Sequence, residues 1–203
     1  VCADYTAYQG FDALFHSVEA YISKQANYMS DMYALRAVEA VSRNLEAAVK
    51  DGNNIAAREM ISLGNNLSSV VMFAGGTTSQ HSLEHGIGAY FPTIPHGAGL
   101  LSFTKAYMRK IVEAHLIDER FIRLARVMGM ENADKPEDFL TALENLMIAC
   151  GVNDVKMSDY GMKREDIPMV VRNARRTNAG LFGNDRLEMT EERCIEIFEE
   201  SYK

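Results

Sequence analysis

Four of the five histidines in this 203-residue chain, together with one aspartate, stand at spacings that suit metal coordination. Asp12 and His16 are four residues apart, and so are His81 and His85, while His96 follows in a Pro-His-Gly sequence. Residues four apart share one face of an α-helix, so each pair can converge on one point. Imidazole and carboxylate bind divalent ions, and the lack of a thiolate in the set favours Zn²⁺ or Fe²⁺ over Cu⁺ or an iron–sulfur cluster. These residues predict a divalent metal site.

The elements that must position these residues are predicted to be helices. Apolar residues recur with helical period along almost the whole chain, whereas the two-residue alternation typical of strands is essentially absent. No G-x-G-x-x-G turn follows a strand, so no dinucleotide-binding βαβ unit is visible. The sequence therefore predicts a single all-α domain, a bundle of about eight to nine helices. We expect these helices over residues 11–24, 28–50, 54–74, 79–90, 97–114, 116–129, 136–150, 165–176 and from Thr190 onward.

Local signals mark some of the helix ends. Pro136 suits a first helical turn, and Gly151 supplies a stop for the same helix. Thr190 can cap the last helix, with two glutamates following in its first turn. These signals place the boundaries of two helices independently of the hydrophobic pattern.

Composition excludes several classes of protein. A net charge of −7 argues against nucleic-acid binding, and no apolar run approaches the length needed to cross a membrane. The three cysteines are widely spaced and form no C-x-x-C, so neither a disulfide framework nor a zinc ribbon is expected. Two of them, Cys150 and Cys194, fall on apolar helical faces and are expected in the core. This cysteine usage favours the reducing cytoplasm.

Two runs of sequence resemble a known family, the iron-containing (group III) alcohol dehydrogenases. Residues 6–21, TAxxGxDALxHxxEAY, are similar to the family's first metal-binding motif, and residues 81–99, HSLEHxxxAxxPxxPHGAG, to its second. The stretches 176–180 and 190–192 near the end also resemble the family. The resemblance thus covers the whole chain.

The resemblance implies a role for each residue of the pattern. The family's metal ligands fall on Asp12, His16, His81 and His96, which would bind one Fe²⁺ or Zn²⁺. His85 matches the histidine that lies near the nicotinamide and the substrate, which makes it a candidate for catalytic proton relay and for cofactor contact. The cofactor implied is NAD(P), with the choice between NAD and NADP left open.

Other residues in or near the motifs have two interpretations each. Glu19 and Glu84 are either exposed on their helices or support the ligands from behind, and neither is expected to be a catalytic acid. Four aromatic residues near the ligands either line an apolar substrate pocket or belong to the core: Phe15, Phe73, Tyr90 and Phe91.

The resemblance further implies a two-domain enzyme. Family members join an N-terminal α/β dinucleotide-binding domain to a helical metal domain, and residues 1–203 resemble only the latter. We therefore expect the dinucleotide-binding domain to be absent from this chain and to be its partner in the whole enzyme. The implied reaction is hydride transfer between NAD(P) and a small alcohol or aldehyde, in a homodimer. We expect the 203-residue chain alone to be inactive.

The sequence leaves other functions open. The chain could be a non-enzymatic metal-binding helical module, or a relative of glycerol dehydrogenase or dehydroquinate synthase within the same superfamily. The metal sites implied for those relatives have fewer histidine ligands. A set of one aspartate and three histidines therefore favours the alcohol dehydrogenase branch. A ferritin-like di-iron bundle requires Glu-x-x-His motifs, and no glutamate here stands three residues before a histidine.

Overall fold

The computed structural model describes residues 1–203 and contains helices but no strand. Eleven α-helices are present, nine of them seven residues or longer, so the predicted all-α class is confirmed. They are α1 (Ala3–Ile22), α2 (Tyr28–Ser42), α3 (Leu45–Lys50), α4 (Ile55–Gly75), α5 (Ser79–Tyr90), α6 (His96–Val112), α7 (Asp118–Val127), α8 (Glu137–Ala149), α9 (Ile167–Thr177), α10 (Ala179–Phe182) and α11 (Glu191–Ser201). Two short 3₁₀ helices cover Met157–Tyr160 and Arg164–Asp166.

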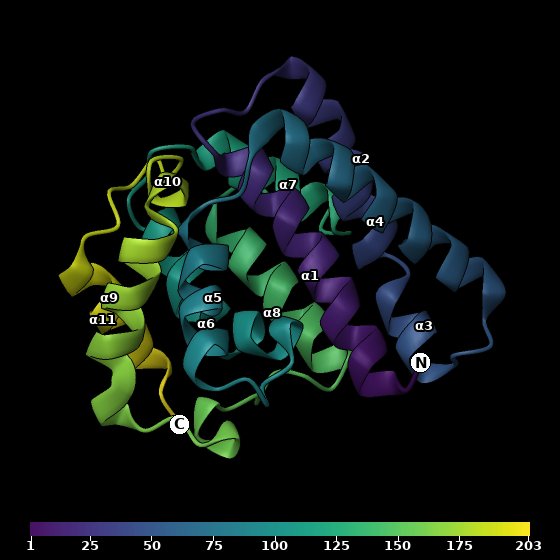
Figure 1. Cartoon of the computed structure of the whole chain (residues 1–203). Coiled ribbons are helices and arrows are strands. Elements are labelled where there is room, and N and C mark those ends of the chain that lie inside the picture. Colours follow the sequence, from purple (N-terminus) through teal and green to yellow (C-terminus); the bar gives the residue numbers. More distant parts are fainter.

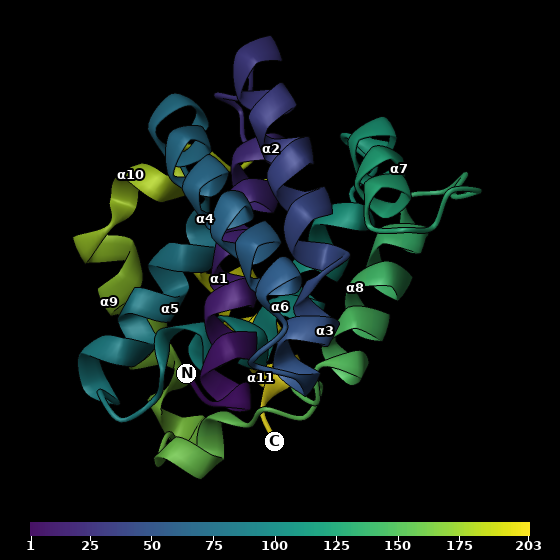
Figure 2. The same cartoon turned by 90° about the vertical axis from the view of Figure 1, so that its right-hand side faces the viewer.

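Helix α1 lies at the centre of the molecule. It packs against α2, α3 and α4 on one side and against α6 on the other, and Figures 1 and 2 show it surrounded by other helices. Helices α5 and α6 separate α1 from α9 and α11, which form the outer edge in Figure 1. Both Phe11 and Phe15 of α1 are completely buried. A helix buried on most of its circumference provides a rigid base for functional side chains.

Helix α1 begins at Ala3, eight residues earlier than predicted. The backbone N–H and the hydroxyl of Thr6 both donate to the carbonyl of Cys2, which closes the first turn. Gly10, a residue that weakens isolated helices, is needed inside this one. A Cβ atom at Gly10 would lie 2.2 Å from Cδ1 of Leu45. The glycine therefore allows α3 to pack closely against α1.

The single helix predicted over 28–50 is wrong, because the chain breaks between α2 and α3. Asn44 ends α2 by donating from Nδ2 to the carbonyl of Ala40 at 2.8 Å, one of the groups that a helix end leaves without a partner. The break redirects the chain so that Leu45 becomes fully buried. A side-chain cap and tertiary burial thus override the continuous apolar pattern.

The other local signals agree with the structure within one residue. Thr190 accepts a hydrogen bond from the N–H of Arg193 at 3.2 Å, and Gly151 adopts a φ of 73° beyond the end of α8. Pro136 is the residue just before α8 rather than in its first turn. The cysteines are unpaired, with Cys150 and Cys194 buried as expected. None of the helices combines the length and apolar character required to cross a membrane.

Candidate metal centre

Three helices bring the predicted ligands together. Asp12 and His16 lie on the inner face of α1, His81 in the first turn of α5, and His96 at the first residue of α6. The start of α6 approaches α1 very closely, because a Cβ atom at Gly97 would lie 2.2 Å from the backbone oxygen of Tyr8. Because Gly97 has no side chain, the start of α6 can lie against α1. The Pro-His-Gly sequence therefore places His96 close to the ligands on α1.

Asp12 is the point on which the histidines converge. Its Oδ1 atom lies 3.2 Å from Nε2 of His81 and 3.4 Å from Nε2 of His96. One ligand atom from each of these three residues lies within 4.8 Å of the others. Three residues that are far apart in the sequence thus offer ligand atoms to one small volume.

His16, the fourth residue predicted as a ligand, adjoins this group. Its Nε2 atom is 3.5 Å from Oδ1 of Asp12, and its ring stacks on that of His81 with centroids 4.0 Å apart. Its Nδ1 atom is buried without a hydrogen-bond partner. Burial and the neighbouring His81 lower the pKa of His16 to about 4. The ring is therefore neutral at pH 7, the form in which an imidazole can coordinate metal.

Two buried carboxylates hold the histidines from behind. Glu19 lies 2.5 Å from Nδ1 of His81, and Glu84 contacts Nδ1 of His96. Both glutamates are at most 2% exposed, so the interpretation that they lie on the helix surface is wrong. Each Nδ1–H donates to a carboxylate, which leaves the Nε2 atoms directed at Asp12. This carboxylate–histidine arrangement is the usual support of histidine ligands in metalloproteins.

The support of His81 extends further into the core. Oε2 of Glu19 accepts bonds from both the N–H and the hydroxyl of Thr78 at 2.8 Å. The Thr78 hydroxyl lies 3.0 Å from the hydroxyl of Tyr107, which donates to Asp185 at 2.8 Å. Burial raises the pKa of Asp185 to about 7. This network could not be predicted from the sequence, because Thr78, Tyr107 and Asp185 belong to no local motif.

The charges of the centre suit a divalent cation. Burial alone would raise the pKa of Asp12, but hydrogen bonds from His81 and His96 hold it well below its ordinary range. Burial opposes charge on both histidines, yet Glu19 and Asp12 raise the pKa of His81 to about 9. Hydrogen bonds to Asp12 and Glu84 likewise outweigh burial and raise the pKa of His96 to about 10. Three carboxylates thus favour positive charge at the place where the histidine Nε2 atoms meet, so the donor set fits a divalent ion.

His85 lies at the exposed edge of the centre. Its Nδ1 atom is 3.3 Å from the side-chain amide of Asn178, and its ring centroid is 5.5 Å from that of His96. Partial burial lowers its pKa. An open depression of about 350 Å³ is lined by His85, Glu84 and His96, among others. His85 is therefore beside the predicted ligands and open to small molecules.

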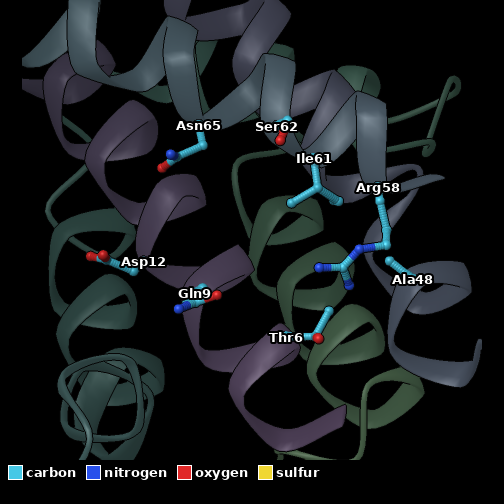
Figure 3. A pocket seen from close by; sticks show the side chains of 8 residues that line it. All are labelled: Thr6, Gln9, Asp12, Ala48, Arg58, Ile61, Ser62 and Asn65. Carbon is cyan, nitrogen blue, oxygen red and sulfur yellow. The ribbon is translucent and has the colours of Figure 1, made fainter. Parts of the chain in front are cut away.

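The aromatic residues near the ligands form no common pocket. Phe15 is buried in the core, which agrees with one of its two interpretations. Phe73 is 97% exposed and Tyr90 is 43% exposed. The cavity that borders Asp12 is instead lined mostly by polar residues of α1 and α4, as Figure 3 shows.

The comparisons with known proteins agree on one family. The family described as "Fe-containing alcohol dehydrogenase family, C-terminal" matches residues 6–202. The chain is 30% identical over 204 residues to 1,3-propanediol dehydrogenase of Klebsiella pneumoniae, covering 97% of this chain and 51% of that protein. It is 32% identical over 196 residues to a long-chain primary alcohol dehydrogenase of Thermoanaerobacter ethanolicus, covering 94% and 48%.

Solved structures give the same result. An archaeal alcohol dehydrogenase from a Red Sea brine pool superposes with a TM-score of 0.93 at 28% identity, covering 99% of this chain and 51% of that chain. A 1,3-propanediol oxidoreductase superposes with a TM-score of 0.91 at 28% identity, covering 100% and 53%. The chain thus spans about half the length of these relatives. It belongs to the Fe-containing alcohol dehydrogenase family and corresponds to the C-terminal, helical part of its members.

Proposed function

We propose that this chain is the metal-binding half of an NAD(P)-dependent alcohol dehydrogenase or aldehyde reductase. Its ligands for one Fe²⁺ or Zn²⁺ are Asp12, His16, His81 and His96. The observation that carries the proposal is the meeting of Asp12 Oδ1 with the Nε2 atoms of His81 and His96, each held from behind by a buried carboxylate. Family membership supports it, because the relatives named above are alcohol dehydrogenases.

The chain's own residues prepare the centre for this chemistry. A bound divalent ion would supply Lewis acidity, which stabilises an alcohol as its alkoxide or polarises an aldehyde carbonyl. Asp12 contributes the negative charge that favours a cation at this point. Glu19 and Glu84 hold the Nδ1 protons of His81 and His96, so that the opposite Nε2 atoms carry the free electron pairs once the charged rings lose their second proton.

His85 is proposed as the proton relay and as a contact for the nicotinamide. The amide of Asn178 donates to its Nδ1, so the neutral ring carries its proton on Nε2. A histidine that is exposed to solvent can exchange the hydroxyl proton of the substrate with water, and the lowered pKa of His85 favours the neutral ring that accepts this proton.

The hydride acceptor or donor is proposed to be NAD(P), held by a dinucleotide-binding domain like those of longer family members. The 203 residues described contain no strand and no glycine-rich phosphate turn, so this chain alone is proposed to bind metal without turning over. Small primary alcohols and aldehydes are the proposed substrates, since one relative is named for 1,3-propanediol. A homodimer is the proposed assembly.

Metal analysis of the purified chain tests the centre. We expect one Fe or Zn per chain, with loss of metal in His81→Ala and His96→Ala. His115→Ala is the matched control, because His115 is exposed and lies outside the centre. A native chain without bound metal, or histidine variants that bind as much metal as the native chain, would contradict the site.

Cofactor turnover tests the assignment of the whole reaction. NADH or NADPH oxidation with small aldehydes is expected from the complete two-domain protein and not from the 203-residue chain. A metal-loaded complete protein that turns over neither alcohols nor aldehydes would favour the non-enzymatic metal-binding module. Turnover by the 203-residue chain would contradict the proposal that activity needs a separate dinucleotide-binding domain.

A further inference from the structure

A polar cavity of about 390 Å³ lies in the groove between α1 and α4 and opens beside the metal centre. Figure 3 shows two rows of side chains facing each other across it. One row comes from α1 at spacings of three residues, and the other comes from one face of α4, with α3 closing one end. The lining residues are Thr6, Gln9, Asp12, Ala48, Arg58, Ile61, Ser62 and Asn65.

The cationic residue of this cavity has no ion-pair partner within the chain. Arg58 is half-buried, and its guanidinium enters none of the ion pairs or side-chain hydrogen bonds of the 203 residues described. In Figure 3 its side chain extends from α4 towards α1, above Thr6. A guanidinium presents five donors in a planar fork that matches a carboxylate or another oxyanion. This arginine is therefore available for an anionic group that enters the groove.

The amides and hydroxyls around Arg58 suit the same kind of group. Gln9, Ser62 and Asn65 form no side-chain hydrogen bond with the rest of the chain and face the cavity. Their donors can complete the coordination of oxygen atoms that the guanidinium leaves uncovered. The lining thus favours an oxygen-rich ligand over a plain hydrocarbon chain.

The geometry links this cavity to the metal centre through Asp12, which lines both. Along α1, Thr6 precedes Asp12 by six residues, so the two ends of the groove are about 9 Å apart at 1.5 Å per residue. A molecule that places one oxygen beside Asp12 and extends towards the Arg58 end of the groove therefore spans this length with about five to seven covalent bonds of about 1.3 Å each, the shorter chains with a final hydrogen bond of about 2.9 Å.

We propose that this cavity is the subsite for the far, carboxylate-bearing end of the substrate, with Arg58 as the residue that determines specificity. The proposal rests on the metal-centred function proposed above and narrows its substrate class to ω-hydroxycarboxylates and the matching aldehyde acids. A phosphate of the nucleotide cofactor is the other source of an oxyanion. Asp12 borders both the cavity and the metal centre, which favours a substrate carboxylate over a cofactor phosphate. The reacting oxygen at the metal and the anion at Arg58 then belong to one short molecule.

Binding of 5-hydroxypentanoate to the Zn²⁺-loaded chain tests the proposal, with 1-pentanol as the neutral probe of equal length. Calorimetry should give at least tenfold tighter binding for the hydroxy acid. Arg58→Gln should abolish this preference, and Arg58→Lys should keep part of it because the charge remains without the fork. Arg36→Gln, which removes the same charge from an exposed surface pair, is the matched control and should bind like the native chain.

Two further probes separate the other outcomes. Pyrophosphate binding that depends on Arg58, without binding of the hydroxy acid, would assign the cavity to the cofactor and overturn the proposal. Equal affinity for the hydroxy acid and pentanol, or no effect of Arg58→Gln, would also overturn it. Binding of pentanoate, which lacks the hydroxyl, is measured in metal-free protein. Arg58-dependent binding of pentanoate would support the anion subsite even if the metal centre fails, whereas no such binding would contradict the subsite itself.

Discussion

His81 donates its Nδ1 proton to Glu19 over 2.5 Å, and neither side chain is more than 3% exposed. The pair is held by tertiary packing, because the two residues are 62 positions apart in the chain. Glu19 in turn accepts two bonds from Thr78, the residue before α5. The orientation of the predicted ligand is thus set by a carboxylate on α1 and by the start of the helix that carries the histidine.

Removing the charge behind His81 should weaken metal binding. Glu19→Gln leaves an amide that holds the Nδ1 proton less strongly, so Nε2 becomes a weaker donor. We expect metal affinity to fall about 10–100-fold, as found for changes to such supporting groups. Competition with a chelator measures the affinity. Glu39→Gln, a change on the surface of α2, should have no effect; equal affinities in the two variants would contradict the supporting role of Glu19.

Metal binding should release protons from the centre. The pKa of His81 is about 9 and that of His96 about 10 in the metal-free protein, so both rings are charged at pH 7.5. Coordination requires the neutral rings, so about two protons should leave per ion, and affinity should rise with pH. Calorimetry in two buffers of different ionisation enthalpy counts these protons. A count near zero would contradict the charged state of the metal-free centre.

The same histidines should make the metal-free fold less stable in alkali. Their pKa values are raised above the ordinary value near 6.5, so their ion pairs stabilise the native state fully below about pH 6.5. This stabilisation is lost as the pH rises through 9 to 10. In His81→Ala, the free energy of unfolding should therefore decrease less in alkali than it does in the native chain. Urea unfolding of chelator-treated protein at several pH values measures this difference. An identical pH profile in both proteins would count against the pairing.

The close approach of α6 to α1 should tolerate no side chain at position 97. Gly97→Ala would place a Cβ atom against the backbone of Tyr8, which cannot rotate away. We expect a loss of about 1–3 kcal/mol in unfolding free energy, with weaker metal binding because His96 shifts with the start of α6. Gly180→Ala is the control, since no atom lies within 4 Å of that added Cβ. Equal stability of the two variants would show that the helices can separate without cost.

The buried carboxyl of Asp185 should impose a second pH dependence. Burial raises its pKa to about 7, so its contribution to stability is full below about pH 4 and is lost as the pH rises through 7. Asp185→Asn removes this titration while keeping a group that can bond Tyr107. The variant should therefore gain stability relative to the native chain between pH 5 and 8, on the order of 2 kcal/mol, since each pKa unit is worth about 1.4 kcal/mol. A constant difference in unfolding free energy across this range would exclude the raised pKa.

Local spacing was enough to predict the helical class and a metal site among Asp12 and the histidines, whereas the choice of His81 and His96 as its ligands came from the resemblance to the family motifs. His81 and His96 belong to motifs whose helical positions can be read from the chain, so their placement needed little tertiary information. The break before Leu45 could not be predicted in this way. It depends on a side-chain cap at Asn44 and on the burial of Leu45 beside Gly10, which only the folded chain brings together.

The surroundings of the metal centre were harder to predict from the sequence than its ligands. The i, i+3, i+4, i+7 spacing of positions 58, 61, 62 and 65 marks one helical face, yet polar residues on a helix normally face solvent. Only the parallel row on α1 turns this face into a cavity. The burial of Glu19 and Glu84 likewise depends on how α1, α5 and α6 pack, so their supporting position could be named only as one of two interpretations.

The close placement of Asp12 and His96 also has a consequence for the unfolded chain. An ion held by both would close a loop that includes α2 to α5, and closing a long loop removes more conformational entropy from the unfolded state than closing a short one. Such an ion would act as a cross-link between α1 and the start of α6. Amide hydrogen exchange in α5 and at the start of α6 should therefore respond to metal more strongly than exchange in α8, which carries no ligand.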